Sequence, residues 1–100
     1  MAVQNVSDLK ETDDGIFVGK LRASTAISAL YEIEQLSVAL RKSVENQDGG
    51  ELVRGLTLRI KDLNTVVMAA IGDDNHPTDD LYYEVYGEKY EPAEEALEAA

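Results

Sequence analysis

Residues 51–71 of this 100-residue chain read ELVRGLTLRIKDLNTVVMAAI, which is a strongly periodic segment. Its apolar residues recur at alternating intervals of three and four positions, at Val53, Leu56, Ile60, Leu63, Val67 and Ala70. That spacing places them on one face of an α-helix, because successive helical residues are rotated by about 100°. Gly72 ends the pattern, so we predict an amphipathic helix over residues 51–71.

A second helical pattern precedes this stretch, over residues 20–46. Its apolar residues recur at the same intervals, at Ala26, Ala29, Ile33, Leu36 and Leu40. The sequence Asn-Gln-Asp-Gly-Gly at residues 46–50 ends it, because paired glycines are costly inside a helix and readily adopt a left-handed turn. Two long amphipathic helices with so short a connection predict an antiparallel helical hairpin. We expect its core to contain Ile33, Leu36, Leu40, Leu56, Ile60, Leu63 and Val67.

The two apolar stripes are wider than one pair of helices needs. Two helices that pack together cover only the facing edges of such stripes, so the remainder requires another surface. A second copy of the chain would supply that surface around a two-fold axis. We therefore predict an all-α fold that assembles as a homodimeric four-helix bundle. The alternative is that the N-terminal and C-terminal segments fold back over the helices as lids.

We divide the chain into an N-terminal arm (residues 1–19), a helical core (residues 20–72) and a C-terminal segment (residues 73–100). In the arm, Asp13-Asp14-Gly15 is a turn signal that precedes a short apolar run. We expect one short strand there, and we expect Phe17, the chain's single phenylalanine, to pack against the helices.

In the C-terminal segment we predict a short helix that begins near Asp80 and breaks at Gly87. Thr78 or Asp79 would cap its first turn, because short oxygen-bearing side chains accept hydrogen bonds from the free amides there. A final acidic helical turn would begin at Pro92, since proline is favoured at the first position of a helix.

Negative charge is concentrated in this last segment. The whole chain has a net charge of −11. Residues 1–72 hold 10 acidic and 8 basic side chains, whereas residues 73–100 hold 10 acidic side chains and only Lys89 as a base. The same segment contains four of the five tyrosines, at positions 82, 83, 86 and 90. The segment therefore combines carboxylates with aromatic rings, whereas the core is nearly neutral.

Composition excludes several functional classes. There is no cysteine and only one histidine, His76, so we expect no thiolate or histidine-rich metal site, no catalytic residues and no cofactor. We interpret His76 as a loop residue that contacts a nearby carboxylate. A net negative chain is a poor electrostatic match for nucleic acid, and no apolar run reaches the length of a membrane span. We expect a cytoplasmic protein that binds neither nucleic acid nor membrane directly.

The acidic, tyrosine-bearing segment is the candidate partner-binding surface. Tyrosine is favoured at interfaces because it buries a large ring while its hydroxyl still finds a partner. A short helix with an acid at every second or third position approaches the charge density of duplex DNA. We therefore expect a basic protein surface, such as that of a nucleic-acid-binding complex, to bind Asp79, Asp80, Tyr83, Glu84, Glu88, Tyr90, Glu91, Glu94 and Glu95.

In size, acidity and lack of catalytic motifs, the chain resembles the small acidic proteins of phages and mobile elements. That class includes DNA mimics and inhibitors of host nucleic-acid-targeting complexes such as anti-CRISPR proteins. The resemblance implies a non-enzymatic inhibitor.

Two other functions remain open from the residues alone. In the first, the chain is a helical dimerisation module or a chaperone-like adaptor, and its acidic segment serves only solubility. In the second, acidic side chains hold Mg²⁺ for catalysis, although the sequence shows no complete constellation for such a site.

Overall fold

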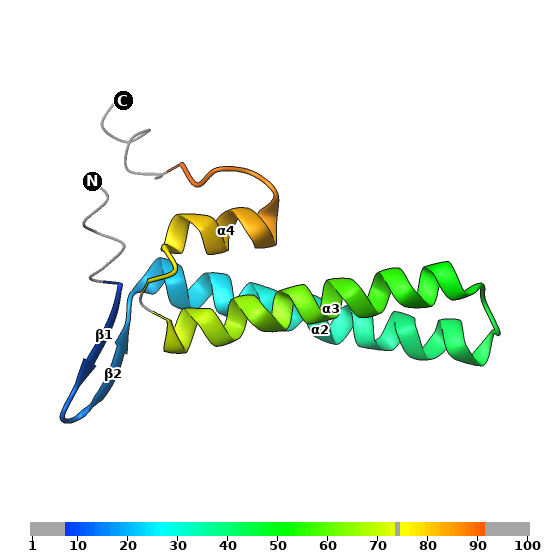
Figure 1. The fold of residues 1–100 in the computed structure, drawn as a ribbon, viewed down its shortest axis with the longest axis horizontal. Coiled ribbons are helices and arrows are strands. Elements are labelled where there is room, and N and C mark those ends of the chain that lie inside the picture. The colour runs from blue at the N-terminus through cyan, green and yellow to red at the C-terminus, as the bar shows by residue number, and fades with distance from the viewer. Residues whose placement is uncertain (1–7, 74, 92–100) are drawn as a thin grey trace.

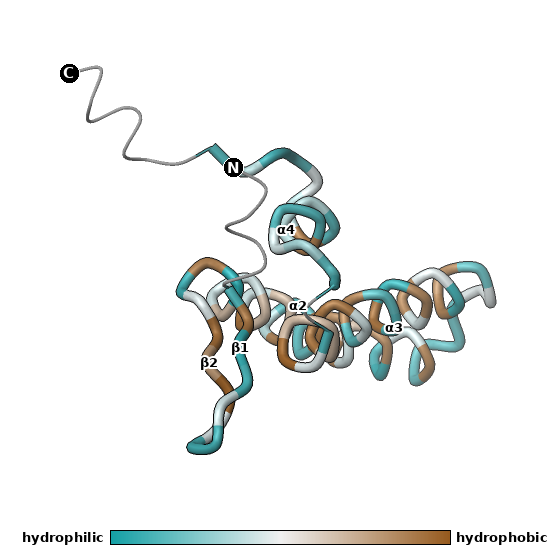
Figure 2. The backbone as a smooth tube through the Cα atoms, turned by 60° about the vertical axis from the view of Figure 1, so that its left-hand side comes forward, coloured by the Kyte–Doolittle hydropathy of each residue, from teal (hydrophilic) through white to brown (hydrophobic). Residues whose placement is uncertain are grey.

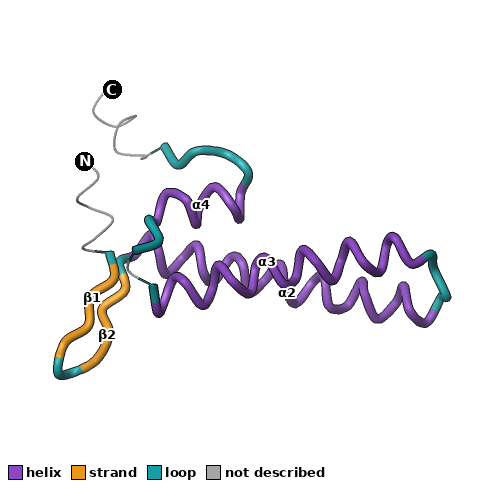
Figure 3. The backbone as a smooth tube through the Cα atoms, viewed as in Figure 1, coloured by secondary structure: helices purple, strands orange, loops and turns teal. Residues whose placement is uncertain are grey.

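A computed structural model describes residues 8–73 and 75–91 of the chain. Two short strands are followed by two long helices and one short helix (Figures 1 and 3). In chain order these elements are β1 (Leu9–Thr12), β2 (Gly15–Val18), α2 (Lys20–Glu45), α3 (Gly50–Gly72) and α4 (Thr78–Tyr86). The predicted helical class is confirmed. The predicted final turn after Pro92 lies outside the described residues.

The all-α prediction is wrong in one respect, because the N-terminal arm contains a small antiparallel sheet. Strands β1 and β2 pair from Leu9 opposite Val18 to Thr12 opposite Gly15. The turn between them depends on Gly15, whose φ of 146° is open mainly to glycine. The single strand expected in the arm is therefore one half of a β-hairpin.

Phe17 does not pack against the helices as expected, since 58% of its surface is exposed. Successive side chains of a strand point to opposite faces of the sheet. Val18 is half-buried, and Leu9, which pairs with it, is buried. Phe17 therefore points to the other, open face.

The two long helices lie side by side, and α3 returns along α2 after the turn at residues 46–49 (Figure 1). The left-handed residue of this turn is Gln47, with φ of 59°, whereas Gly49 is extended and immediately precedes α3. We expected the paired glycines to take the left-handed conformation, and that expectation is wrong. The amide of Asp48 instead bonds to the carbonyl of Ser43, which closes the end of α2 at a distance of 2.9 Å.

The short helix α4 begins at Thr78, two residues before the predicted start. Pro77 occupies the N-cap position, and no side chain caps the first turn. The expected capping by Thr78 or Asp79 is therefore wrong, because both residues are already helical. Gly87 ends α4 in a left-handed conformation, and its amide bonds to the carbonyl of Tyr83 at 2.7 Å.

The core lies where α4 crosses the first half of α2 and the second half of α3. Its buried apolar side chains are Ala26, Ala29, Leu63, Val66, Ala69, Ala70 and Leu81. Many of these are alanines, whose small side chains allow the three helices to approach closely. Of the seven core residues expected from the sequence, Leu63 is fully buried, and the other six are half-buried.

The two sides of the long helices carry different elements. Helix α4 packs on one side, and the β-hairpin projects from the opposite side (Figures 1 and 2). Figure 2 shows that β2 is hydrophobic along much of its length, whereas β1 is mainly hydrophilic. Ile16 and Phe17 of β2 are both more than half exposed, so this projecting hairpin carries exposed apolar side chains.

A substitution at Thr25 tests the packing of this core. Thr25 is fully buried, and its hydroxyl oxygen has no hydrogen-bond partner among the described residues. Thr25→Val replaces that hydroxyl with a methyl group of similar size, so we expect the free energy of unfolding to rise by about 1 kcal/mol. Urea denaturation followed by circular dichroism measures the change. Loss of stability in this variant would mean that the hydroxyl is satisfied in the folded protein.

Candidate functional site

Arg22 holds the start of α4 against the long helices. Its side chain is fully buried and donates hydrogen bonds to three parts of the chain. Two reach the carbonyls of Ala69 and Ala70 near the end of α3, both at 2.8 Å. The others reach the carbonyls of Asp73 and His76, at 2.7 and 2.8 Å, and the hydroxyl of Thr78, at 3.1 Å.

The end of a helix is a suitable environment for a buried guanidinium. The last four carbonyls of a helix have no intrahelical donor, and they form the negative end of the helix dipole. An arginine offers five N–H donors in a rigid planar arrangement. Arg22 thus compensates for its desolvation by satisfying carbonyls at the end of α3 and in the following loop.

Arg22 was not among the residues predicted from the sequence, although the sequence contains a signal for it. Arg22 lies four residues before Ala26 and seven before Ala29, which places it on the apolar stripe of α2. A charged side chain at a stripe position indicates either an interface or a buried polar network. The residues that Arg22 contacts lie 47 to 56 positions away, so the sequence pattern could not identify them.

Arg59 on α3 holds the other end of α4. Its guanidinium donates to both carboxylate oxygens of Glu32 on α2, at 2.9 and 3.2 Å. It also donates to the carbonyls of Glu84 and Val85 in the last turn of α4, at 3.1 and 3.2 Å. The hydrogen bond to Glu32 raises the pKa of Arg59 above its ordinary value. One arginine from each long helix therefore fixes one end of α4.

The position of α4 decides which of its side chains face solvent. Leu81 and Thr78 are buried against the long helices. Tyr83 lies two residues after Leu81, on the opposite face of the helix, and 57% of its surface is exposed. Asp79 and Asp80 are also exposed, in the first turn of α4, where carboxylates interact favourably with the positive end of the helix dipole.

Three tyrosines pack together beside this exposed face. The ring of Tyr82 lies 4.3 Å from that of Tyr86 and 5.2 Å from that of Tyr90, between centroids. The second contact is edge to face, and it requires the chain after Gly87 to turn back along α4. The hydroxyls of Tyr86 and Ser28 lie 2.5 Å apart, which links this group to α2. The segment after α4 is thus held near the helix.

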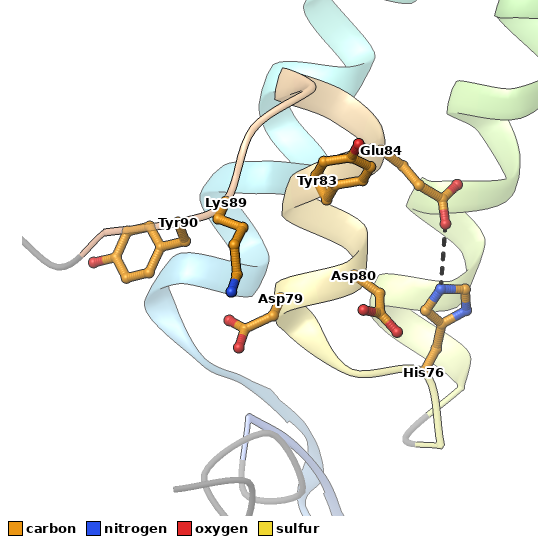
Figure 4. A pocket seen from close by; sticks show the side chains of 7 residues that line it. All are labelled: His76, Asp79, Asp80, Tyr83, Glu84, Lys89 and Tyr90. Carbon is orange, nitrogen blue, oxygen red and sulfur yellow. Dashed lines mark ion pairs between the residues drawn. The ribbon is translucent and has the colours of Figure 1, made fainter.

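A half-open hollow of about 340 Å³ lies between α4 and the flanking segments (Figure 4). Three carboxylates, two tyrosines, a histidine and a lysine line it. These residues are His76, Asp79, Asp80, Tyr83, Glu84, Lys89 and Tyr90. The Nε2 atom of His76 lies 3.5 Å from a carboxylate oxygen of Glu84, as the dashed line in Figure 4 marks. The interpretation of His76 as a loop residue beside a carboxylate is therefore confirmed.

The hollow brings together part of the predicted partner-binding surface. The predicted residues that line it are Asp79, Asp80, Tyr83, Glu84 and Tyr90. His76 and Lys89 also line it, although they were not among the predicted residues. Glu88 and Glu91 are exposed but do not line the hollow. Glu94 and Glu95 lie outside the described residues.

The chemistry of the hollow favours a cation or a basic side chain. Its three carboxylates outnumber the single ammonium of Lys89, and its two tyrosines add aromatic surface.

Among residues 8–73 and 75–91, no three histidine or acidic side chains converge in a way that could hold a metal ion. No helix in the described part of the chain has both the length and the hydropathy needed to cross a membrane.

Comparison with known proteins found no matching family model, no matching curated protein and no matching solved structure.

Replacement of Arg22 tests its role in holding α4. Arg22→Lys keeps the positive charge but cannot donate to five acceptors, so we expect the free energy of unfolding to fall by about 2–3 kcal/mol. Hydrogen exchange of the α4 amides should accelerate by more than that of the α2 and α3 amides. Arg41→Lys, an exposed change in the same helix, serves as the control and should leave both quantities unchanged. Equal stability of the two variants would contradict the assigned role.

The tyrosine group predicts a pH dependence. Desolvation, together with the nearby Glu88 carboxylate, raises the pKa of Tyr82 above its usual value of 10.0. Because the raised pKa favours the neutral phenol in the folded state, this contribution to stability is present below pH 10.0 and is lost as the pH rises through the folded-state pKa. Absorbance titration at 295 nm should show one late-ionising tyrosine. Tyr82→Phe should remove that step, whereas Tyr31→Phe should retain it.

Proposed function

We propose that this protein is a non-enzymatic interaction protein that binds a basic protein segment in the hollow beside α4. One observation carries the proposal: three carboxylates and two tyrosines line a single half-open hollow of about 340 Å³. That volume lies within the range of small-molecule binding pockets and accommodates one extended lysine or arginine side chain.

The lining suits a basic side chain in two ways. Carboxylates form charge-assisted hydrogen bonds with ammonium and guanidinium groups, and these bonds are about twice as strong as neutral ones. The faces of tyrosine rings also attract such cations. Tyr83 and Tyr90 therefore supply contact area, while Asp79, Asp80 and Glu84 supply charge complementarity.

The site also has the rigidity that binding requires. Arg22 and Arg59 fix the two ends of α4, so the side chains of the hollow are positioned before a partner arrives. Preorganisation increases affinity because less conformational entropy is lost on binding. A loose acidic tail would lack this advantage.

The most specific form of the proposal is inhibition by mimicry of nucleic acid, as in the anti-CRISPR class that the chain resembles. The carboxylates of α4 would then occupy a basic groove that normally binds phosphates. In a competition assay, the protein should displace duplex DNA from a basic DNA-binding domain. If the protein binds a basic peptide but does not displace DNA, mimicry of nucleic acid is refuted. Only the general form of the proposal, binding of a basic protein segment, then remains.

Calorimetric titration with a deca-arginine peptide at several salt concentrations tests the general form. The triple variant Asp79→Asn, Asp80→Asn, Glu84→Gln should bind about tenfold more weakly at low salt, and affinity for the unmodified protein should fall as salt rises. The matched control is Glu11→Gln, Asp13→Asn, Asp14→Asn, which removes the same charge from the exposed β-hairpin. It should bind almost as well as the unmodified protein. An equal loss in both variants would show that only net charge matters.

A second candidate function is a dimerisation or adaptor module, in which α2 and α3 form a helical hairpin and pair with a second copy as a four-helix bundle. A specific observation favours it: many large apolar side chains of the long helices are about half exposed or more, among them Ile27, Leu30, Val38, Leu58 and Met68. A stable monomer gains little from such exposure, whereas a helical interface would use it.

A further inference from the structure

An apolar hollow lies between α2 and α3 on the side that α4 does not cover. Its volume is about 250 Å³, and its lining includes Val18, Ala23, Ile27, Leu30, Val67 and Ile71. About half of the surface of Ile27, Leu30 and Ile71 is exposed. The lining also includes Ala26 and Ala70, which belong to the buried core and lie on the predicted apolar stripes. This surface therefore continues from the edge of the core to the exposed side of the long helices.

Charged residues flank the apolar part of this surface in a symmetric arrangement. Lys20 lies seven residues before Ile27, and Glu34 lies seven residues after it. Seven residues are close to two helical turns, so all three side chains share one face of α2. Lys20 and Glu34 are both exposed, and neither forms an ion pair with another of the described residues.

A large and a small residue are arranged about Ile27 in the same way. Tyr31 lies four residues after Ile27, and Ala23 lies four residues before it. Tyr31 is 65% exposed, and it is the only tyrosine outside the C-terminal segment. A ring at one position and a methyl group at the other are complementary in size if the two positions meet across an interface.

We infer that a second copy of this chain docks on this surface, with the two α2 helices antiparallel about a two-fold axis at Ile27. In such a pair, residues equally distant from Ile27 on either side meet. Lys20 then faces Glu34 of the partner subunit, and Tyr31 packs over Ala23 of the partner subunit. Both contacts occur twice, as two-fold symmetry requires.

The distribution of charge favours a second copy over a basic partner at this surface. The acidic hollow lies on the opposite side of the long helices, with α4, so two copies keep these regions apart when they dock here. The docking residues belong to the part of the sequence before residue 73, which is nearly neutral. Like-charge repulsion between the copies is therefore small at this face.

The position of the axis sets the length of the contact. About Ile27, residues 20–34 of α2 meet the same residues of the second copy, so the paired helices overlap over about 22 Å. A strip of that length and about 20 Å wide, or two helix diameters, covers roughly 440 Å² per subunit, which is the size of a small, weak interface. This inference rests on the second candidate function and does not depend on binding of a basic partner.

Sedimentation equilibrium of the full chain tests the docking surface. The unmodified protein should be dimeric, and Ile27→Glu should raise the dimer dissociation constant at least about a hundredfold, because it buries two carboxylates at the axis. Val44→Glu places a carboxylate at an exposed apolar site of α2 that lies outside the paired residues 20–34, and it should have little effect. A monomeric unmodified protein, or equal effects of the two substitutions, would overturn the inference.

Charge reversal tests the antiparallel arrangement. Lys20→Glu and Glu34→Lys should each weaken the dimer about fivefold or more at low salt, because each places like charges together twice. The double variant should restore the original affinity. Glu34→Lys is decisive, since it removes two units of negative charge per chain and would strengthen the dimer if only net repulsion mattered. Strengthening by Glu34→Lys, or failure of the double variant to recover, would overturn the arrangement.

The deca-arginine titration separates this inference from the basic-partner proposal. Ile27→Glu should bind the peptide as the unmodified protein does, because the hollow beside α4 lies on the other side of the long helices. If the unmodified protein is dimeric but does not bind the peptide, only the basic-partner proposal is refuted. If it is monomeric and binds the peptide, only the docking surface is refuted.

Discussion

The arrangement of the three helices depends on one buried guanidinium. Arg22 extends from α2 to the last carbonyls of α3, to the loop that follows and to the first residue of α4. A buried charge is costly unless hydrogen bonds replace its hydration. Because the acceptors of those hydrogen bonds lie on three segments, none of the three segments can move without breaking some of the bonds. Arg22 thus connects both long helices to the start of α4.

This connection gives the molecule two different sides. On one side, Arg22 and Arg59 hold α4 so that its carboxylates and Tyr83 face solvent around the hollow. On the other side, nothing among the described residues covers Ile27 and Leu30, and the β-hairpin projects beside them. The acidic side suits a basic partner, and the apolar side suits a second copy. The two proposals therefore concern separate surfaces and do not compete.

Much of the helical structure could be predicted from local patterns. The periodic apolar residues and the breaks at Asn46 and Gly72 predicted two helices that the structure places at nearly the same residues. The same approach failed at the β-hairpin, whose strands have only four residues each, too few for a clear period. The same approach also predicted the wrong environment for Phe17. The face of the sheet on which a strand residue lies depends on the register of its strand with the neighbouring strand.

The order of the apolar side chains is enough to predict a mainly helical chain, because these side chains recur with a period of about 3.6 residues. The sequence also shows that negative charge and tyrosines accumulate after residue 73. Which of these residues lie together depends on the tertiary fold. The contacts of Arg22 join residues 47 to 56 positions apart, and no local pattern encodes contacts at that separation. Those contacts set the orientation of α4. Because of that orientation, Asp79, Asp80 and Glu84 line the hollow, whereas Glu88 and Glu91 do not.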